Sequence, residues 1–171
     1  AIQDFEIPEH LLVARARAAR MIAPSGMTVD MPCGDGFVGL VDREVFDEWL
    51  RARAALAGAE RRTGTFESIE RDSDGCAVIV YRGERGGDPV RVRARSVIGA
   101  DGARSKVARA TVKGADKVPC VFAYHEIVKS PAVASDVFDP DRCDVYYQGH
   151  LSPDFYAWIF PHGETASVGV G

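Results

Sequence analysis

The stretch from residue 95 to residue 109 limits what this chain can fold into more than any other. A charged residue, a short apolar run, Gly-Ala-Asp-Gly at 99–102 and a helical pattern over 103–109 follow one another. This order predicts a strand whose carboxyl end turns directly into a helix, which is where α/β proteins hold nucleotides. Glycines let the backbone approach a phosphate, and the first N–H groups of the helix attract it. An Asp-Gly pair is equally typical of a plain turn, so the local pattern leaves both interpretations open.

The wider pattern of this stretch resembles the second nucleotide fingerprint of the flavoprotein hydroxylase and geranylgeranyl reductase superfamily. Its one departure is Ser96, where that fingerprint prefers an apolar residue. The resemblance implies that Asp101, Gly102 and Ser105 contact the dinucleotide, with FAD and the reduced nicotinamide both lying beside them.

A helix is predicted from about residue 43 to residue 57. Asp42 is a good N-cap, and Gly58 is a typical residue just past a helix end. Apolar residues recur at helical spacing and define one face, namely Val45, Phe46, Trp49, Leu50, Ala54 and Leu56. We expect Phe46 and Leu50 to lie in the core.

Arg43 stands in the first turn of this helix. By spacing it can pair with Asp47 one turn on, or it can meet an anion at the helix N-terminus. Members of the superfamily carry a similar Arg-x-x-Phe-Asp-x-x-Leu helix whose arginine reaches the flavin dinucleotide. The resemblance therefore assigns FAD binding to Arg43.

A dense aromatic segment occupies residues 146–163. Alternation places Tyr156, Trp158 and Phe160 on one face of a strand, which is typical either of a core or of the wall of a long apolar pocket. Tyr-x-Trp-x-Phe-Pro followed by Val-Gly-x-Gly resembles the substrate-domain motif of geranylgeranyl reductases. The string over 152–169 is especially similar to the branch that acts on geranylgeranylated chlorophyll or bacteriochlorophyll. This resemblance, which covers nearly the whole chain, implies that the three aromatic residues line the pocket for the isoprenoid tail.

The remaining pattern is mostly that of strands. Residues 13–22 fit a helix by their Ala and Arg content and a strand by their alternation, so both stay open. Other strands are predicted at 28–31, 36–41, 65–71, 76–81, 90–93, 121–128, 143–149, 155–160 and 165–170. The aspartates around Pro140 are expected to lie in a solvated loop, and they are Asp136, Asp139, Asp141 and Asp144.

We predict a mixed α/β fold: an FAD/NAD(P)-binding mixed sheet with a β-meander, then the start of an antiparallel substrate-binding sheet. Residues 1–116 are assigned to the first domain and residues 117–171 to the second. Both domains are expected to be incomplete, because the chain lacks an initiator Met and stops in a strand-like run. The glycine-rich motif for the FAD pyrophosphate would precede residue 1, so this piece alone is expected to bind FAD poorly and to be inactive.

Composition excludes several classes of protein. The net charge of −4 gives no basic field for nucleic acid. No apolar run reaches the length of a membrane span, and no signal peptide is visible, which favours a cytoplasmic protein. The four cysteines are widely spaced and predict reduced thiols without a metal site; they are Cys33, Cys76, Cys120 and Cys143.

The resemblance implies a flavin-dependent oxidoreductase that reduces C=C bonds of a geranylgeranyl chain, with a chlorophyll-type pigment as the favoured carrier and a membrane lipid as the other. FAD and NADPH are the implied cofactors. The lipophilic substrate implies contact with a membrane surface, such as a photosynthetic membrane, without crossing it. No residue is named as proton donor, and His150 and His162 are interpreted as strand-end residues in water.

Two other functions stay open at this stage. One is an FAD-dependent monooxygenase for an aromatic or polyketide substrate, which would share Arg43 and Asp101 but would not need the aromatic strand. The other is a non-enzymatic lipid- or pigment-binding module, which would not oxidise a nicotinamide.

Overall fold

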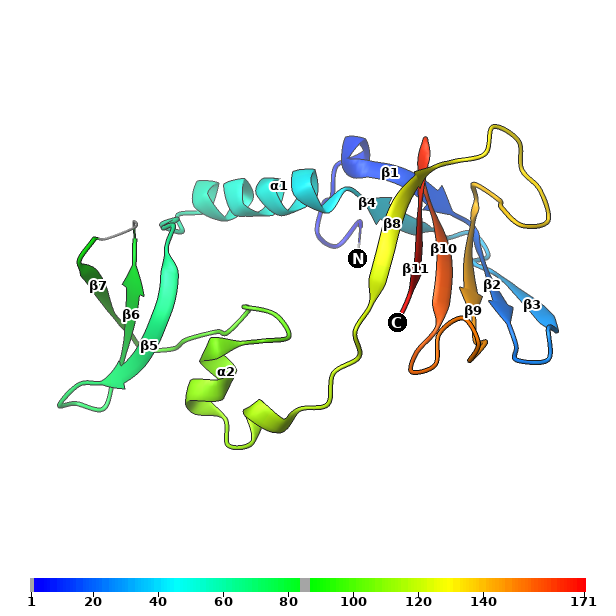
Figure 1. The fold of residues 1–171 in the computed structure, drawn as a ribbon. Coiled ribbons are helices and arrows are strands. Elements are labelled where there is room, and N and C mark those ends of the chain that lie inside the picture. Colours follow the sequence, from blue (N-terminus) through cyan, green and yellow to red (C-terminus); the bar gives the residue numbers. More distant parts are fainter. Residues whose placement is uncertain (1, 84–86) are drawn as a thin grey trace. The chain divides into compact units, whose positions relative to one another are not determined.

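The computed structural model describes residues 2–83 and 87–171 and has the predicted mixed α/β fold (Figure 1). The chain divides into two compact units. The first consists of Ala1–Leu56 and Val121–Gly171, and the second of Ala57–Cys120.

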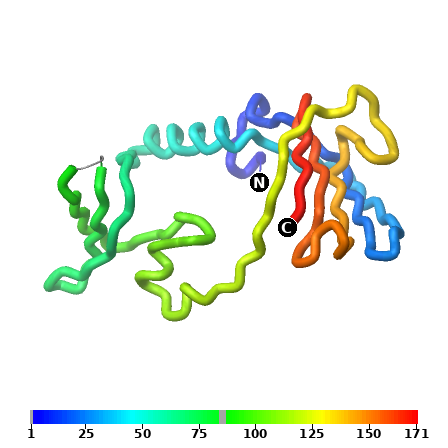
Figure 2. The backbone as a smooth tube through the Cα atoms, viewed as in Figure 1, coloured from blue at the N-terminus to red at the C-terminus, as the bar shows by residue number. Residues whose placement is uncertain are grey.

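A six-stranded sheet forms the body of the first unit. Its strands, in spatial order, are β3 (Thr28–Pro32), β2 (Ala18–Ile22), β9 (Arg142–Tyr146), β10 (Ala157–His162), β11 (Thr165–Val170) and β8 (Tyr124–Lys129). The pairing of β2 with β9 is parallel, and the other pairings are antiparallel. Figure 2 follows the chain through β9, β10 and β11, which run up and down as neighbours. This sheet contains strands from before and after residue 116, where the domain boundary was expected. The assignment of residues 1–116 to cofactor binding and of residues 117–171 to substrate binding stays a prediction.

The ambiguous segment at 13–22 forms two strands. β1 (Leu12–Ala16) pairs with β4 (Val38–Val41), and β2 joins the large sheet. Ala16 is completely buried and Ile22 nearly so. Burial on one face and backbone pairing with distant strands therefore outweigh the helix propensity of Ala and Arg. A short 3₁₀ turn, η1 (Glu9–Leu11), precedes β1.

The helix α1 (Arg43–Leu56) begins where the sequence predicts. The Asp42 carboxylate accepts the N–H of Glu44 at 2.9 Å, and Gly58 has a positive φ of 97° beyond the last turn. The apolar face of α1, which was expected to lie in the core, is not buried. Every residue of this helix is at least partly exposed to solvent. Phe46 stacks on Trp49 at 5.8 Å between ring centroids, while Leu56 is 91% exposed. No described helix is both long and apolar enough to cross a lipid bilayer.

The second unit contains the β-meander at almost the predicted bounds. Its elements are β5 (Thr65–Arg71), β6 (Ala77–Arg82), β7 (Pro89–Ala94), α2 (Lys106–Thr111) and the 3₁₀ turn η2 (Ala115–Lys117). The three strands form an antiparallel sheet in chain order, and α2 packs against β5. Val78 and Val80 of the central strand are buried and, being two residues apart, lie on the same face of the meander.

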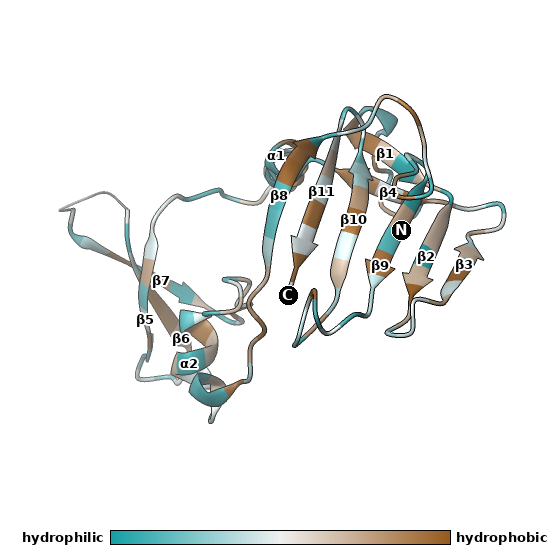
Figure 3. Cartoon of the chain, turned by 45° about the vertical axis from the view of Figure 1, so that its right-hand side comes forward, coloured by the Kyte–Doolittle hydropathy of each residue, from teal (hydrophilic) through white to brown (hydrophobic). Residues whose placement is uncertain are grey.

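The register of the six-stranded sheet separates its side chains into two faces, since neighbours along a strand point to opposite sides. One row runs through Met21, Val145, Trp158, Gly169 and His125. We call the side that carries this row the aromatic face. The adjacent row lies on the opposite side of the sheet and begins with the charged residues Asp30, Arg20 and Asp144. We call this side the charged face. Figure 3 shows apolar residues recurring along β9, β10 and β11.

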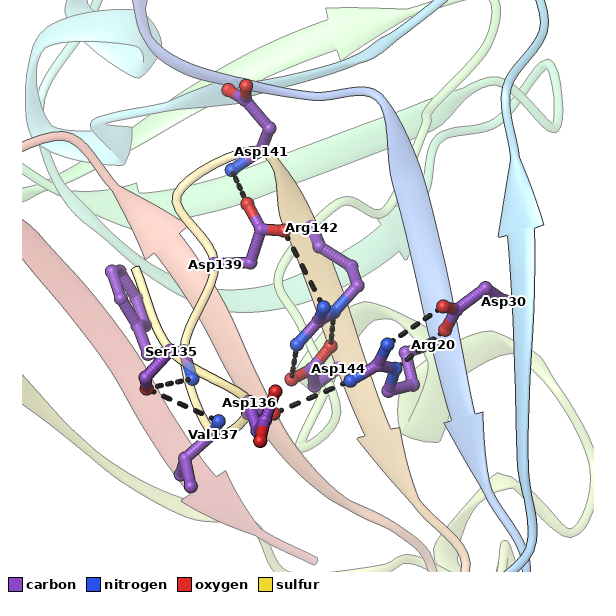
Figure 4. Close-up of polar contacts among 10 residues, drawn as sticks. Arg20, Asp30, Ser135, Asp136, Val137, Asp139, Asp141, Arg142 and Asp144 are labelled. Carbon is purple, nitrogen blue, oxygen red and sulfur yellow. Dashed lines mark hydrogen bonds and ion pairs between the residues drawn. The ribbon is translucent and has the colours of Figure 1, made fainter. Parts of the chain in front are cut away.

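Ion pairs on the charged face lie within β9 and its preceding loop and between β2 and β3 (Figure 4). Arg142 contacts both carboxylate oxygens of Asp144, at 2.6 and 3.1 Å, and Asp139 of the preceding loop lies 3.5 Å from the same guanidinium. Arg20 contacts both oxygens of Asp30, at 2.6 and 2.8 Å. Asp144 is only 2% exposed, so the expectation of a solvated loop is wrong for this residue. It lies in β9, where the adjacent Arg142 compensates its buried charge.

Replacing Asp144 by alanine is expected to lower the free energy of unfolding by about 3 kcal/mol, because the buried Arg142 then loses the carboxylate that accepts its two hydrogen bonds and keeps only the longer contact with Asp139. Urea unfolding followed by Trp158 fluorescence, in a Trp49→Phe background, measures the change. Asp30→Ala is the matched control, since Asp30 also pairs with an arginine of the sheet but is exposed. We expect the control to lose clearly less stability. Equal losses in the two variants would contradict a special role for the buried pair.

Candidate functional site

Two side chains of the 99–109 stretch cap the start of α2. The Asp101 carboxylate accepts the backbone N–H groups of Lys106 and Val107, at 2.7 and 3.2 Å, and the hydroxyl of Ser105. The Ser105 Oγ atom in turn accepts the N–H of Ala108 at 2.8 Å. Together these contacts satisfy N–H groups that a helix start leaves unpaired. The helix therefore begins at Lys106 rather than at residue 103.

The strand expected before this cap is not formed. β7 ends at Ala94, Ile98 is 90% exposed, and no described residue pairs with 95–99 as a strand. Extended backbone becomes a strand only when a neighbour takes up its hydrogen bonds, and none of the described residues does so here. The two glycines are nevertheless explained. Gly102 has a φ of +78°, and a Cβ on Gly99 would lie 2.9 Å from the Val107 side chain.

A hollow of about 300 Å³ lies beside this capped helix start. Its lining includes Gly102, Arg104, Ser105, Arg109, Asp116 and Cys120. The Arg109 guanidinium donates to the carbonyl groups of Ser105 and Arg104, at 3.2 and 2.5 Å, and so braces the loop. The hollow thus adjoins two of the residues predicted to bind a cofactor, and two guanidinium groups give its wall positive charge.

Contacts within the protein keep Asp101 ionised. The Ser105 hydroxyl, followed by the N–H groups of Val107 and Lys106, holds the pKa of the Asp101 carboxyl below its usual value. Both carboxylate oxygens are engaged by the helix start. In this structure, Asp101 therefore shapes the loop and the helix end rather than presenting a free carboxylate.

Arg43 pairs with Asp47 as the helical spacing allows. Its Nε and Nη2 atoms contact the two Asp47 oxygens at 2.7 and 3.0 Å, and the Arg43 side chain is 77% exposed. The hydrogen bond from Arg43 lowers the pKa of Asp47. Arg43 belongs to the first unit, whereas Asp101, Gly102 and Ser105 belong to the second. Its predicted contact with the flavin dinucleotide stays a prediction.

The structure brings the three predicted aromatic residues together on the aromatic face. The ring centroids of Tyr156 and Trp158 are 5.9 Å apart, and those of Trp158 and Phe160 are 6.2 Å apart. Tyr147 and Phe155 extend the row, at 5.9 and 4.1 Å from the Tyr156 ring. We call these five side chains the aromatic ladder. The three predicted residues are half-buried, so the ladder is neither a closed core nor a freely solvated surface.

The centre of the ladder is held by Ser167 and Gly169, which the sequence analysis included in the family motif without a role of their own, and by His125, which it did not single out. Trp158 Nε1 donates to the Ser167 Oγ atom at 3.1 Å, and His125 Nδ1 lies 3.0 Å from the same oxygen. Gly169 stands directly opposite Trp158 on β11. Alternation over 165–170 could have placed Ser167 and Gly169 on one face, but nothing local shows which strand faces them. Among the described residues, no cluster of three or more His, Cys, Asp or Glu is suited to a metal ion.

Comparisons with known proteins identify the family of this chain. Residues 13–159 match the family described as FAD binding domain. The chain is 58% identical over 170 residues to a geranylgeranyl diphosphate reductase of Rhodobacter capsulatus, covering 99% of this chain and 42% of that protein. It is 36% identical over 157 residues to a digeranylgeranylglycerophospholipid reductase of Methanocaldococcus jannaschii, covering 88% of this chain and 38% of that protein.

A solved structure shares the fold at low sequence identity. The flavin-dependent brominase Bmp2 superposes with a TM-score of 0.74 at 18% identity, over 98% of this chain and 42% of that one. This likeness shows that the arrangement of strands and helices occurs in a flavin-dependent enzyme, and its low identity carries no statement about substrate.

Replacing Asp101 by alanine is expected to expose the amides of residues 106 and 107 to hydrogen exchange, because both lose their acceptor. Asp101→Asn keeps a carbonyl oxygen and should retain part of the protection. Since the folded pKa of Asp101 is lowered, its stabilising contribution is present above about pH 4 and is lost as the pH falls further. Exchange rates that are unchanged in Asp101→Ala would contradict the capping role.

Proposed function

We propose that this chain, which belongs to the FAD binding domain family, is the part of a flavin-dependent reductase that receives a geranylgeranyl chain on its aromatic face. The observation that carries the proposal is the aromatic ladder, whose rings lie together on one face of the sheet and remain partly exposed, so that an apolar chain can contact them. The relatives named above support it, since both are reductases with geranylgeranyl groups in their names. The chain spans 42% of the first relative, so the activity is proposed for the complete protein.

The residues of the second unit fit a dinucleotide. At Gly102 the φ is positive, and no heavy atom lies within 4 Å of the position that a Cβ would occupy. This open backbone borders the hollow with Arg104 in its wall, and small residues with a nearby cation suit a phosphate. Gly102 and Ser105 would approach the dinucleotide, while Asp101 would fix the loop that they belong to. FAD is the cofactor that the family implies, and NADPH is proposed as its reductant.

Arg43 would contribute a second positive charge to the flavin dinucleotide. Among the described contacts, Asp47 engages the Nε and Nη2 atoms of Arg43, which leaves Nη1 for an anion. The pairing also limits the rotamers of the long side chain, so that less conformational entropy is lost when an anion binds.

The aromatic ladder would hold an extended apolar chain and exclude water from it. An isolated alkene is a poor hydride acceptor, so reduction requires that the double bond be held close to the donor in a dry site. When bound, reduced FAD supplies the hydride, and a proton is added to the other carbon of the double bond. Tyr156, Trp158 and Phe160 would position the chain by contact with their ring faces. The proton donor is not assigned to a residue of this chain.

A pigment is proposed as the favoured carrier of the geranylgeranyl chain, with a membrane lipid as the other carrier. The string over 152–169 favours the pigment, whereas the archaeal relative is named for a phospholipid. Either carrier is lipophilic, so the complete protein is proposed to work at a membrane surface.

The complete protein, loaded with FAD and given NADPH and geranylgeranyl diphosphate, tests the proposal. We expect the product mass to rise in steps of two hydrogens. Trp158→Ala is expected to lower turnover about tenfold or more, as for loss of a buried aromatic contact, while flavin reduction by NADPH persists. Trp49→Ala, an aromatic residue on α1, is the matched control and should turn over normally. Rapid flavin reduction with an unchanged isoprenoid in the unaltered protein would overturn the reductase assignment.

Replacing Arg43 by alanine is expected to weaken FAD binding about tenfold, because one charge-assisted hydrogen bond to the dinucleotide is lost. Titration of the apoprotein with FAD, followed by flavin fluorescence, measures the dissociation constant. Arg51→Ala removes an equal charge from the same helix and serves as the control. If both variants weaken FAD binding equally, the effect is one of net charge, and the contact assigned to Arg43 is wrong.

A further inference from the structure

The Trp158 indole lies across β11 in a space that exists only because residue 169 has no side chain. A Cβ built on Gly169 would stand 2.3 Å from Trp158 Cζ2 and 2.6 Å from Cε2, closer than non-bonded carbon atoms approach. On its other side, the same Cβ would stand 2.7 Å from the Cβ of His125. The missing side chain of Gly169 therefore leaves a space on the aromatic face. The Trp158 indole occupies this space, and His125 lies on its other side.

The glycine is required for space rather than for backbone conformation. Positive φ angles occur at several glycines of this chain, but Gly169 is not among them. Its backbone is that of an ordinary strand residue, paired with Trp158 on β10 and with His125 on β8. An alanine could adopt this conformation without strain, so its only penalty would be the collision with its neighbours.

A second contact fixes the indole in the same place. The Trp158 Nε1 donates to Ser167, two residues before Gly169 on the same face of β11. The ring is thus held at one end by a hydrogen bond and lies over the gap with its six-membered ring. Because Tyr156 and Phe160 both contact Trp158, a lifted indole would break the ladder at its centre.

We propose that Gly169 is a specificity-determining position that selects long isoprenoid chains by keeping the Trp158 indole low against β11. The inference rests on the proposed function, since it assumes that the aromatic face receives the chain. When the indole lies flat against β11, the rings of the ladder form a continuous apolar surface along β10. A raised indole would obstruct a chain that must pass over the whole ladder, and it would obstruct a short chain less. Gly169 acts through Trp158 and is therefore a positioning residue.

The test compares Gly169→Ala with the unaltered complete protein, using geranylgeranyl diphosphate as substrate and geranyl diphosphate as a short competitor. We expect the KM for the long chain to rise about tenfold, the size of an overpacking defect, and the inhibition constant of the short chain to change less. Flavin reduction by NADPH should be unchanged. Equal changes for both chain lengths, or none, would overturn the proposal.

A double-mutant cycle separates the indole from other effects of the added methyl group. In a Trp158→Phe background the larger ring is gone, so adding Gly169→Ala should raise KM by a smaller factor than it does in the unaltered protein. The contact with the His125 Cβ is present in both backgrounds and cancels in the comparison. Equal factors would show that Gly169 does not act through the indole.

Two further measurements keep the outcome decisive. In a background in which every tryptophan of the complete protein except Trp158 is replaced by phenylalanine, Gly169→Ala should make Trp158 easier to quench by acrylamide, whether or not the protein turns over. If the unaltered protein forms no reduced product, the proposed function fails, while quenching and competition between long and short chains still decide the role of Gly169.

If Gly169→Ala does not fold, Ser167→Ala removes the hydrogen bond that also holds the indole, without adding atoms. This variant should also raise the long-chain KM. An unchanged KM and unchanged quenching in that variant would overturn the proposal.

Discussion

Parallel pairing between β2 and β9 is the constraint on which the first unit depends. It sets Ala18 opposite Arg142 and Ile22 opposite Tyr146, and so joins the N-terminal hairpin of β2 and β3 to the strands that follow residue 124. A shift of one residue in this register would exchange the two faces of β2 and β3. Arg20 and Asp30 would then move to the aromatic face, and Met21 to the charged face. The separation of the two faces therefore rests on this one pairing.

The two faces have different physical tasks. On the charged face, Arg142 and Asp144 are buried and compensate each other, while Arg20 and Asp30 continue the pairing toward the sheet edge. Buried ion pairs add little net stability, but they penalise a wrong register severely because each misplaced charge would lose its partner. On the aromatic face, rings fixed by Ser167 and Gly169 are left half-buried. The ion pairs of the charged face thus favour the correct strand register, and the rings of the aromatic face remain accessible to a ligand.

Local patterns predict much of this fold. Alternation and turn residues locate the β-meander and the strands of residues 124–170, and an N-cap with helical spacing locates α1. One choice that the sequence left open and two wrong predictions share one cause, namely that the outcome depends on residues far away in the sequence. Residues 13–22 become strands because distant partners pair with them, Asp144 is buried because it lies inside a sheet, and residues 95–99 remain irregular because none of the described residues pairs with them. At the site, alternation places Tyr156, Trp158 and Phe160 together, but the roles of Ser167 and Gly169 depend on which strand lies opposite β10.

The central claim is that the aromatic face, rather than the charged face, receives an isoprenoid chain. A geranylgeranyl analogue with a photoreactive diazirine at its tail, bound to the complete protein and mapped by mass spectrometry after illumination, tests this claim most directly. We predict labelling of the peptide that contains Tyr156, Trp158 and Phe160, with loss of the label when unmodified geranylgeranyl diphosphate competes. Labelling confined to the second unit or to the loop that contains Asp136 and Asp139 would contradict the account.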